Sequence, residues 1–223
     1  MSTASRLISG SAASWMRIGI TMVSQLALVP IYLNFWSVET YGVWLAIQAL
    51  VAIMTMIDMG HQTYLGYEFL RFGKAGLKEL GKYLWSGVAI GMVIGTLQII
   101  CILAIIHTGA LPYLLGDLKV PQPSLIADAG TVLLLQGIVW LVNTSMGGLL
   151  VRALEPYGYF PRLAWWGVFQ ALVNAIAPAI AVTFNAGLLT AGIVIAVASM
   201  VTNIPIFMDM FHLMRKEGIP FSS

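Results

Sequence analysis

The residues of this 223-residue chain that could do chemistry are few, and the most informative is an arginine inside an apolar run. Arg17 lies in the run that extends from Trp15 to Trp36. Thr21, Ser24 and Gln25 follow it at spacings that place all four side chains on one face of a helix. A planar guanidinium can donate two parallel hydrogen bonds to a phosphate or diphosphate. These four residues are therefore candidates for the wall of an anion-binding cavity.

Two acidic residues also fall inside apolar runs. A charged group deep in a spanning helix costs at least about 2.5 kcal/mol, so it needs a partner, water or a route to the lipid headgroups. Asp58 lies at a similar depth to Arg17 on the next run, and a structural ion pair between them is the main alternative to a ligand-binding arginine. Snorkelling of Arg17 to the inner headgroups is a third possibility. Asp209 could pair with Arg215 or with a neighbouring helix.

Motifs for catalysis, metals and cofactors are missing from the sequence. The three histidines, His61, His107 and His212, are far apart, and no phosphate-binding loop, nucleophile elbow or close pair of acidic motifs occurs. The single Cys101 excludes an intramolecular disulfide. We therefore expect no catalytic residue, no metal site and no cofactor, and transport is favoured over enzymatic activity.

Composition identifies the class of protein that must hold these residues. Hydrophobic residues make up 59% of the chain and charged residues 9%, with a mean hydropathy of +0.89. Soluble domains carry about 25% charged residues, so a soluble domain and a disordered chain are excluded. A net charge of +2 is too small for a nucleic-acid partner. The sequence predicts an all-α, polytopic membrane bundle, a single unit over residues 1–223, with six spans at about 15–36, 41–60, 84–106, 127–151, 163–184 and 188–214.

The basic residues predict how these spans are oriented. Alternate loops collect every lysine and arginine except Lys119, which indicates that both termini lie in the cytoplasm. The stretch 64–80 mixes large apolar residues with basic ones, and we interpret it as an amphipathic segment on the cytoplasmic surface.

Every predicted span also contains at least two uncharged polar residues. Interhelical hydrogen bonds could account for each, at about 1 kcal/mol apiece, but their number favours a hydrated central cavity. Mid-span Trp140 is expected to pack in the core. The polar residues of the spans are Thr21, Ser24, Gln25, Asn34, Gln48, Thr55, Thr96, Gln98, Gln136, Asn143, Thr144, Ser145, Gln170, Asn174, Ser199, Thr202 and Asn203.

The first two spans carry a motif of a known family. A short turn reads acid-x-Tyr-Gly-x-Trp from Glu39 to Trp44, an apolar run follows, and Asp-x-Gly closes it at Asp58 to Gly60. This segment resembles the Wzx-type polysaccharide flippases of the multidrug/oligosaccharidyl-lipid/polysaccharide exporter superfamily. The later spans match only in number, length and orientation.

The resemblance implies a transporter of the bacterial inner membrane that flips undecaprenyl-diphosphate-linked oligosaccharides to the outer leaflet for O-antigen or exopolysaccharide synthesis. It implies two six-helix lobes around a cationic cavity, with Arg17 as the arginine of the first helix. The expected partners are the lipid-linked oligosaccharide, membrane lipids and a second six-helix lobe, either a missing carboxyl-terminal half or a dimer partner. We expect the amino-terminal half of a longer protein.

Two other functions stay open. One is a multidrug or small-solute antiporter of the same superfamily. It would need a protonatable acid deep in a lobe, and the sequence places Asp58 and Asp209 near the span ends. The other is a non-transporting membrane assembly module.

Overall fold

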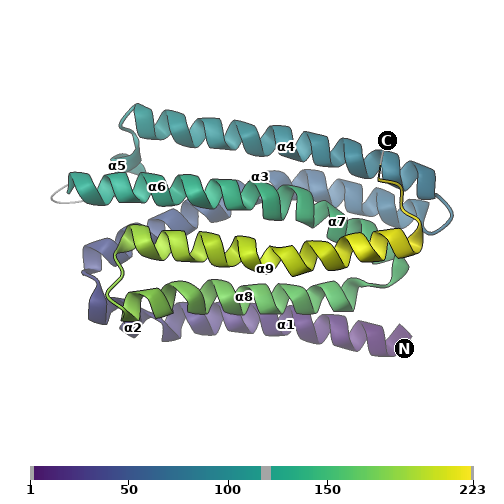
Figure 1. Cartoon of the computed structure of the whole chain (residues 1–223), viewed down its shortest axis with the longest axis horizontal. Helices are drawn as coiled ribbons and strands as arrows, with labels where there is room; N and C mark the ends of the chain where they lie inside the picture. The colour runs from purple at the N-terminus through teal and green to yellow at the C-terminus, as the bar shows by residue number, and fades with distance from the viewer. Residues whose placement is uncertain (1–2, 117–121, 222–223) are drawn as a thin grey trace.

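The computed structural model describes residues 3–116 and 122–221, which form a bundle of long helices (Figure 1). No β-strand occurs among the described residues, so the predicted all-α class is confirmed. In chain order the elements are α1 (Thr3–Ala27), α2 (Val29–Phe35), α3 (Val38–Phe72), α4 (Leu77–His107), α5 (Leu111–Leu114), α6 (Pro123–Trp140), the π-helix η1 (Leu141–Met146), α7 (Gly147–Leu154), the 3₁₀ turn η2 (Glu155–Tyr157), α8 (Phe160–Thr183) and α9 (Leu188–Glu217).

Six of the described helical segments are long and apolar enough to cross a membrane. They are Ile8–Phe35, Val38–Phe72, Leu77–His107, Pro123–Tyr157, Phe160–Thr183 and Leu188–Glu217, and each contains or closely matches one of the predicted spans. The chain is thus built as a multi-pass membrane protein. At 35 residues, α3 is about 52 Å long and exceeds the hydrocarbon core of a bilayer, which is about 30 Å thick.

The segment 64–80, predicted to be amphipathic, does not form a helix of its own. α3 continues without a break to Phe72, and α4 begins at Leu77, so the segment is the end of one helix, a turn and the start of the next. The turn between α3 and α4 contains Gly73 and Gly76. Gly73 has φ +57°, a conformation that a residue with a Cβ adopts at a cost.

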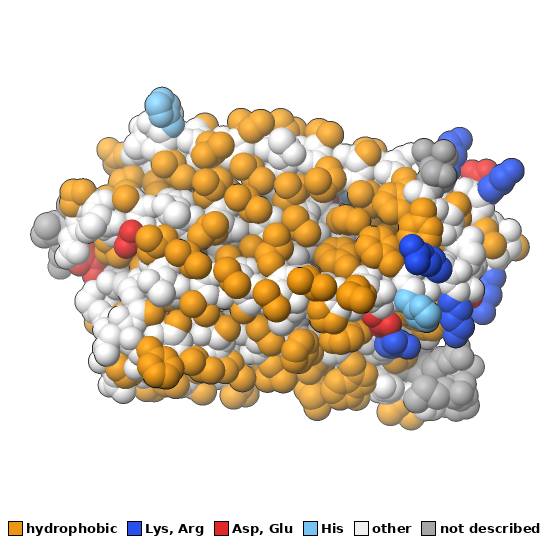
Figure 2. All heavy atoms as spheres, in the orientation of Figure 1, with side chains coloured by type: hydrophobic (Ala, Val, Ile, Leu, Met, Phe, Trp, Pro, Cys, Tyr) orange, Lys and Arg blue, Asp and Glu red, His pale blue; other side chains and the backbone are white. Residues whose placement is uncertain are grey.

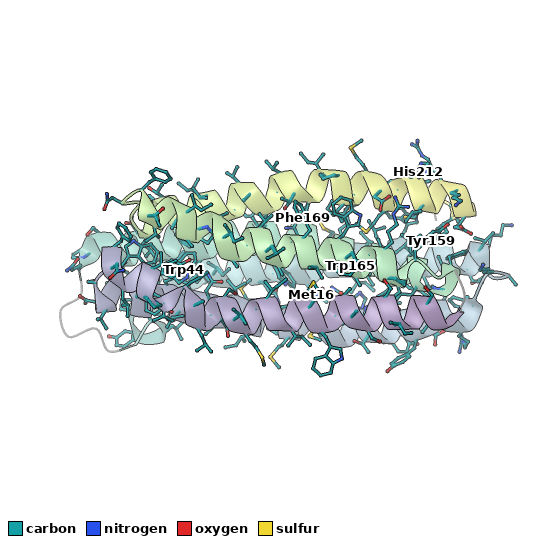
Figure 3. All side chains as sticks on the ribbon, turned by 90° about the horizontal axis from the view of Figure 1, so that it is seen from below. Met16, Trp44, Tyr159, Trp165, Phe169 and His212 are labelled. Carbon is teal, nitrogen blue, oxygen red and sulfur yellow. The ribbon has the colours of Figure 1, made fainter. Side chains whose placement is uncertain are left out.

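The first two spans pack on different helices of the bundle. α1 packs chiefly on α8, whereas α3 packs on α4, α6 and α7. α1 and α8 run side by side along most of their length (Figure 3). At their far end the indole of Trp36 donates a hydrogen bond of 2.8 Å to the carbonyl of Ala186.

The bundle has two apolar cores. One contains Trp36, Trp44 and Leu133 near the α2–α3 turn, and the other contains Phe69 and Leu213 near the opposite end. The buried polar side chains of the described residues all fall between these cores along their helices, and we call this set the polar layer. Its members are Asp58, Gln62, Gln98, Gln136, Ser145, Ser199 and Asn203.

The distribution of apolar and charged side chains on the surface is the one expected for a protein that spans a bilayer. On the face shown in Figure 2, apolar side chains cover the middle of the bundle, and the lysines and arginines gather at one end. Both ends of the chain lie at that same end (Figure 1). An even number of spans between two ends on one side is the arrangement that the sequence predicted.

Candidate functional site

Arg17 lies well inside the first span. It follows Ile8, where the span begins, by nine residues, or about 14 Å of helix. Its side chain is exposed and its guanidinium lies along α8, where an added Cβ on Gly167 would be 3.5 Å from Nη1. Among the described residues, no acidic side chain forms an ion pair with Arg17. The structure therefore places an exposed cation inside a candidate membrane span, with exposed apolar neighbours at Met16 and Ile18.

The three polar residues predicted with Arg17 share its face. Thr21 and Gln25 are exposed, and Ser24 is half-buried. The Thr21 hydroxyl donates to the carbonyl of Arg17 at 2.9 Å, and the Ser24 hydroxyl donates to the carbonyl of Thr21 at 3.0 Å. Both hydroxyl protons are thus used within the helix, and the oxygens remain available as acceptors.

Next to this face, α1 and α8 form a shallow groove of about 420 Å³. Its lining is mostly apolar, with Met16, Ile20, Leu172 and Ile176 around Ser24. Only 6% of the apolar window of the first span is buried, less than for any other candidate span. α1 therefore presents an uncovered face that carries the predicted site, and no described element closes it into a cavity.

The predicted ion pair between Arg17 and Asp58 does not form. Asp58 is fully buried, and its Oδ2 accepts a hydrogen bond from the amide of Gln62, one turn further along α3. Arg17 and Asp58 lie at similar positions along the bundle, but their helices pack on different neighbours. α1 packs on α8, whereas α3 packs on α4 and α7. Similar depth was the only signal for this pair, and it does not determine which helices touch.

Asp58 lies well inside α3, because this helix continues beyond the predicted end of the span. It lies about 21 Å from the end of α3 at Phe72 and about 30 Å from the beginning at Val38. The second oxygen of its carboxyl group, Oδ1, is buried without a hydrogen-bond partner. Gln62, at i+4 from Asp58, is a residue that the sequence analysis missed, although this spacing on a helix was visible.

The π-helix η1 packs on α4, and α7, which follows η1, packs on α3. An added Cβ on Gly91 of α4 would be 3.4 Å from Cβ of Ser145 in η1, and the Gln62 amide occupies the space left by Gly148 just after it. π-helical turns within α-helices are rare and frequently occur at functional sites. Buried polar atoms without a described partner gather here: Gln98 Oε1, Gln136 Nε2, Trp140 Nε1, Asn143 Oδ1 and Ser145 Oγ.

Four of the other polar residues of the spans form hydrogen bonds across the α8–α9 interface. Asn174 accepts from Ser199 at 2.7 Å, and Gln170 donates to Asn203 at 3.0 Å. These four side chains form the interhelical hydrogen bonds that were the alternative to a hydrated cavity. The prediction of a hydrated central cavity is not needed to explain them.

Asp209 pairs with a neighbouring helix rather than with Arg215. Both Nε and Nη2 of Arg162 donate to its carboxylate, at 2.9 and 2.5 Å, and the indole of Trp166 donates at 2.9 Å. Arg162 and Trp166 are one turn apart on α8. This clamp joins α8 to α9 at the end of the bundle where the basic residues lie.

Within the part of the chain that the structure describes, no group of three His, Cys, Asp or Glu residues could hold a metal ion. The three histidines stay apart, and His61 uses its Nε2 on the carbonyl of Gly87 at 3.0 Å. Trp140 is buried, as expected for a core residue. Lys119 lies outside the described residues.

Comparison with known proteins adds no relative. No family model, no curated protein and no solved structure matches this chain. What the chain can do must therefore be argued from its own residues.

Proposed function

We propose that this chain is one lobe of a transporter that moves an anionic, lipid-linked oligosaccharide across the bacterial inner membrane. The observation that carries the proposal is the exposed Arg17 inside the first span. A charged side chain facing acyl chains costs at least about 2.5 kcal/mol, so Arg17 needs water, an anion or a route to the headgroups, and the polar residues beside it favour an anion in water. The diphosphate of a polyprenyl-linked sugar is negatively charged and offers oxygens that can accept two parallel hydrogen bonds from a guanidinium group.

The uncovered face of α1 supports a second lobe as a partner. Arg17, Thr21 and Gln25 are exposed together on the least buried of the candidate spans. A second six-helix unit, from the same gene product or from another copy, would turn this face into one wall of a cavity. The resemblance of Glu39–Trp44 and Asp58–Gly60 to the polysaccharide flippases points to the same arrangement.

The gathering of basic residues at one end of the bundle supports cytoplasmic termini. In that orientation Arg17 lies closer to the inner leaflet, where a lipid-linked sugar precursor made in the cytoplasm is first bound.

The experiment is the export of surface polysaccharide by cells in which the full-length protein carries Arg17→Ala, Arg17→Lys or the control Arg71→Ala. We expect Arg17→Ala to abolish export and Arg17→Lys to restore part of it, because lysine keeps the charge without the fork. Arg71 is exposed at the basic end beside Glu68, and its loss should leave export unchanged. Normal export by Arg17→Ala would remove the diphosphate role and favour an assembly module.

One observation favours a second function, an antiporter for drugs or small solutes. Such a protein needs an acid inside a lobe, and the structure buries Asp58 completely. Efflux of a cationic dye that depends on Asp58 but not on Arg17 would identify this function.

A further inference from the structure

We propose that the basic end of α8 binds one anionic phospholipid from the adjoining leaflet, with the lipid phosphate on Arg162 and an acyl chain against Trp165 and Phe169. The ligand is a lipid of the surrounding membrane and not the transported molecule. The site therefore does not rest on the proposed function.

A shallow pocket of about 520 Å³ opens on α8 near the beginning of the helix. Its lining residues are Arg162, Trp165, Trp166 and Phe169. The span begins at Phe160, so Arg162 lies about 3 Å of helix from that end and Phe169 about 14 Å. Figure 3 shows Trp165 nearer than Phe169 to the end of the bundle marked by His212. The pocket thus presents a cation at headgroup level and aromatic rings below it, which matches a phospholipid from its phosphate to its acyl chain.

The aromatic rings of this pocket are held in place by other side chains. The indole of Trp165 donates to the Ser9 hydroxyl at 3.2 Å. The indole of Trp166 donates to the Asp209 carboxylate at 2.9 Å, and its ring meets that of Phe169 edge-on, with the centroids 6.0 Å apart. A site whose side chains are already fixed loses little conformational entropy when a ligand binds. The pocket is therefore pre-organised.

Arg162 keeps donors for a second anion. Its Nε and Nη2 donate to Asp209, and its side chain is 57% exposed. In the described part of the chain, no hydrogen bond uses Nη1. A guanidinium group has five N–H donors, and phosphate oxygens form strong hydrogen bonds with them. A phosphate can therefore bind here while the clamp on Asp209 stays closed.

The charges around the pocket favour an anionic headgroup over a zwitterionic one. The acids of α8 and α9 are Asp209, which the clamp holds, and Glu217, which accepts from the Tyr159 hydroxyl. In its last turn α9 adds Arg215 and Lys216. A headgroup ammonium would have to compete for carboxylates that are already bonded, whereas a phosphate meets an excess of basic residues, which attract anionic lipids.

An apolar stripe continues from the pocket along α8 and can take an acyl chain. Phe169, Leu172, Ile176 and Ile180 follow one another at helical spacing, and each is between 38 and 51% exposed. From Phe169 to Ile180 the stripe is about 16 Å long, close to half of the hydrocarbon core, which is about 30 Å thick. Leu172 and Ile176 also line the shallow groove between α1 and α8. The stripe therefore gives one chain of the bound lipid a path through its leaflet.

The lipid pocket and Arg17 lie on different sides of α8. The Arg17 guanidinium lies beside Gly167. Gly167 is two residues from both Trp165 and Phe169, and residues two apart on an α-helix point in directions about 160° apart. Substitutions in the pocket can therefore be tested without touching the face that carries Arg17.

The test is native mass spectrometry of the purified full-length protein in detergent, titrated with phosphatidylglycerol, phosphatidylethanolamine or glycerol phosphate. We expect phosphatidylglycerol to bind more tightly than phosphatidylethanolamine. Arg162→Ala should weaken its binding about fivefold, the contribution of one basic residue near an anionic surface. Trp165→Ala should also weaken it and leaves the clamp intact, which covers the case in which Arg162→Ala fails to fold. The controls Arg71→Ala and Tyr67→Ala remove an exposed cation and an exposed ring at the same end and should leave binding unchanged.

Asp209→Asn separates lipid binding from the clamp. It removes the ion pair but leaves Arg162 with more donors for a phosphate, so phosphatidylglycerol binding should be kept or strengthened. Equal affinity for the two lipids would overturn the proposal, as would an equal loss in Arg162→Ala and Asp209→Asn or in Arg162→Ala and Arg71→Ala. Displacement of the lipid by an equal concentration of glycerol phosphate would also overturn it, because the acyl chain would then contribute nothing.

Discussion

The clamp around Asp209 allows one prediction to be worked out in numbers. Its side chain is only 10% exposed, whereas that of Arg162 is 57% exposed. A hydrogen bond to a charged group contributes about 1.5–3 kcal/mol, which applies to the Trp166 indole. The ion pair with a half-exposed guanidinium is screened and contributes about 0.2–1 kcal/mol. Asp209→Ala should therefore lower the free energy of unfolding by about 2–4 kcal/mol.

The variants of the two donors separate these contributions. Arg162→Ala removes only the screened ion pair and should cost about 0.2–1 kcal/mol. Trp166→Phe removes the indole donor and keeps the ring, so it should cost more than Arg162→Ala. Equilibrium unfolding in mixed detergent–SDS micelles measures all three. If Arg162→Ala proves as destabilising as Asp209→Ala, the exposed guanidinium is not screened and the reasoning fails.

Two further predictions concern helix packing and pH. Gly192→Ala should destabilise the bundle by about 1–3 kcal/mol, because the new Cβ would lie 2.7 Å from Cγ1 of the stiff Val132; Gly19→Ala, with nothing within 4 Å, should be neutral or stabilising in the same SDS assay. The Tyr159 hydroxyl donates to Glu217 at 2.5 Å, and this hydrogen bond, with some burial, raises the pKa of Tyr159 above 10.0. The stabilisation is present below pH 10.0 and lost as the pH rises further, so Tyr159→Phe should be less stable at neutral pH and the difference should shrink in alkali.

The spans were predictable because membrane insertion depends on composition over about 20 residues, which is a local property. Their ends were less predictable. The second span was expected to stop at Gly60, since polar residues follow. The helix continues because Asp58, Gln62, Leu65 and Phe69 share one buried face that packs inside the bundle, where a mixed sequence is tolerated. The helix ends only at Phe72, just before Gly73.

The candidate site was predictable in part. Helical spacing alone places Arg17, Thr21 and Gln25 on one exposed face, because a single helix fixes it. The ion pair with Asp58 failed because it depends on which helices touch, and that is set by packing over the whole bundle. The same reason hid the clamp on Asp209, whose partners come from α8, more than 40 residues away in the chain.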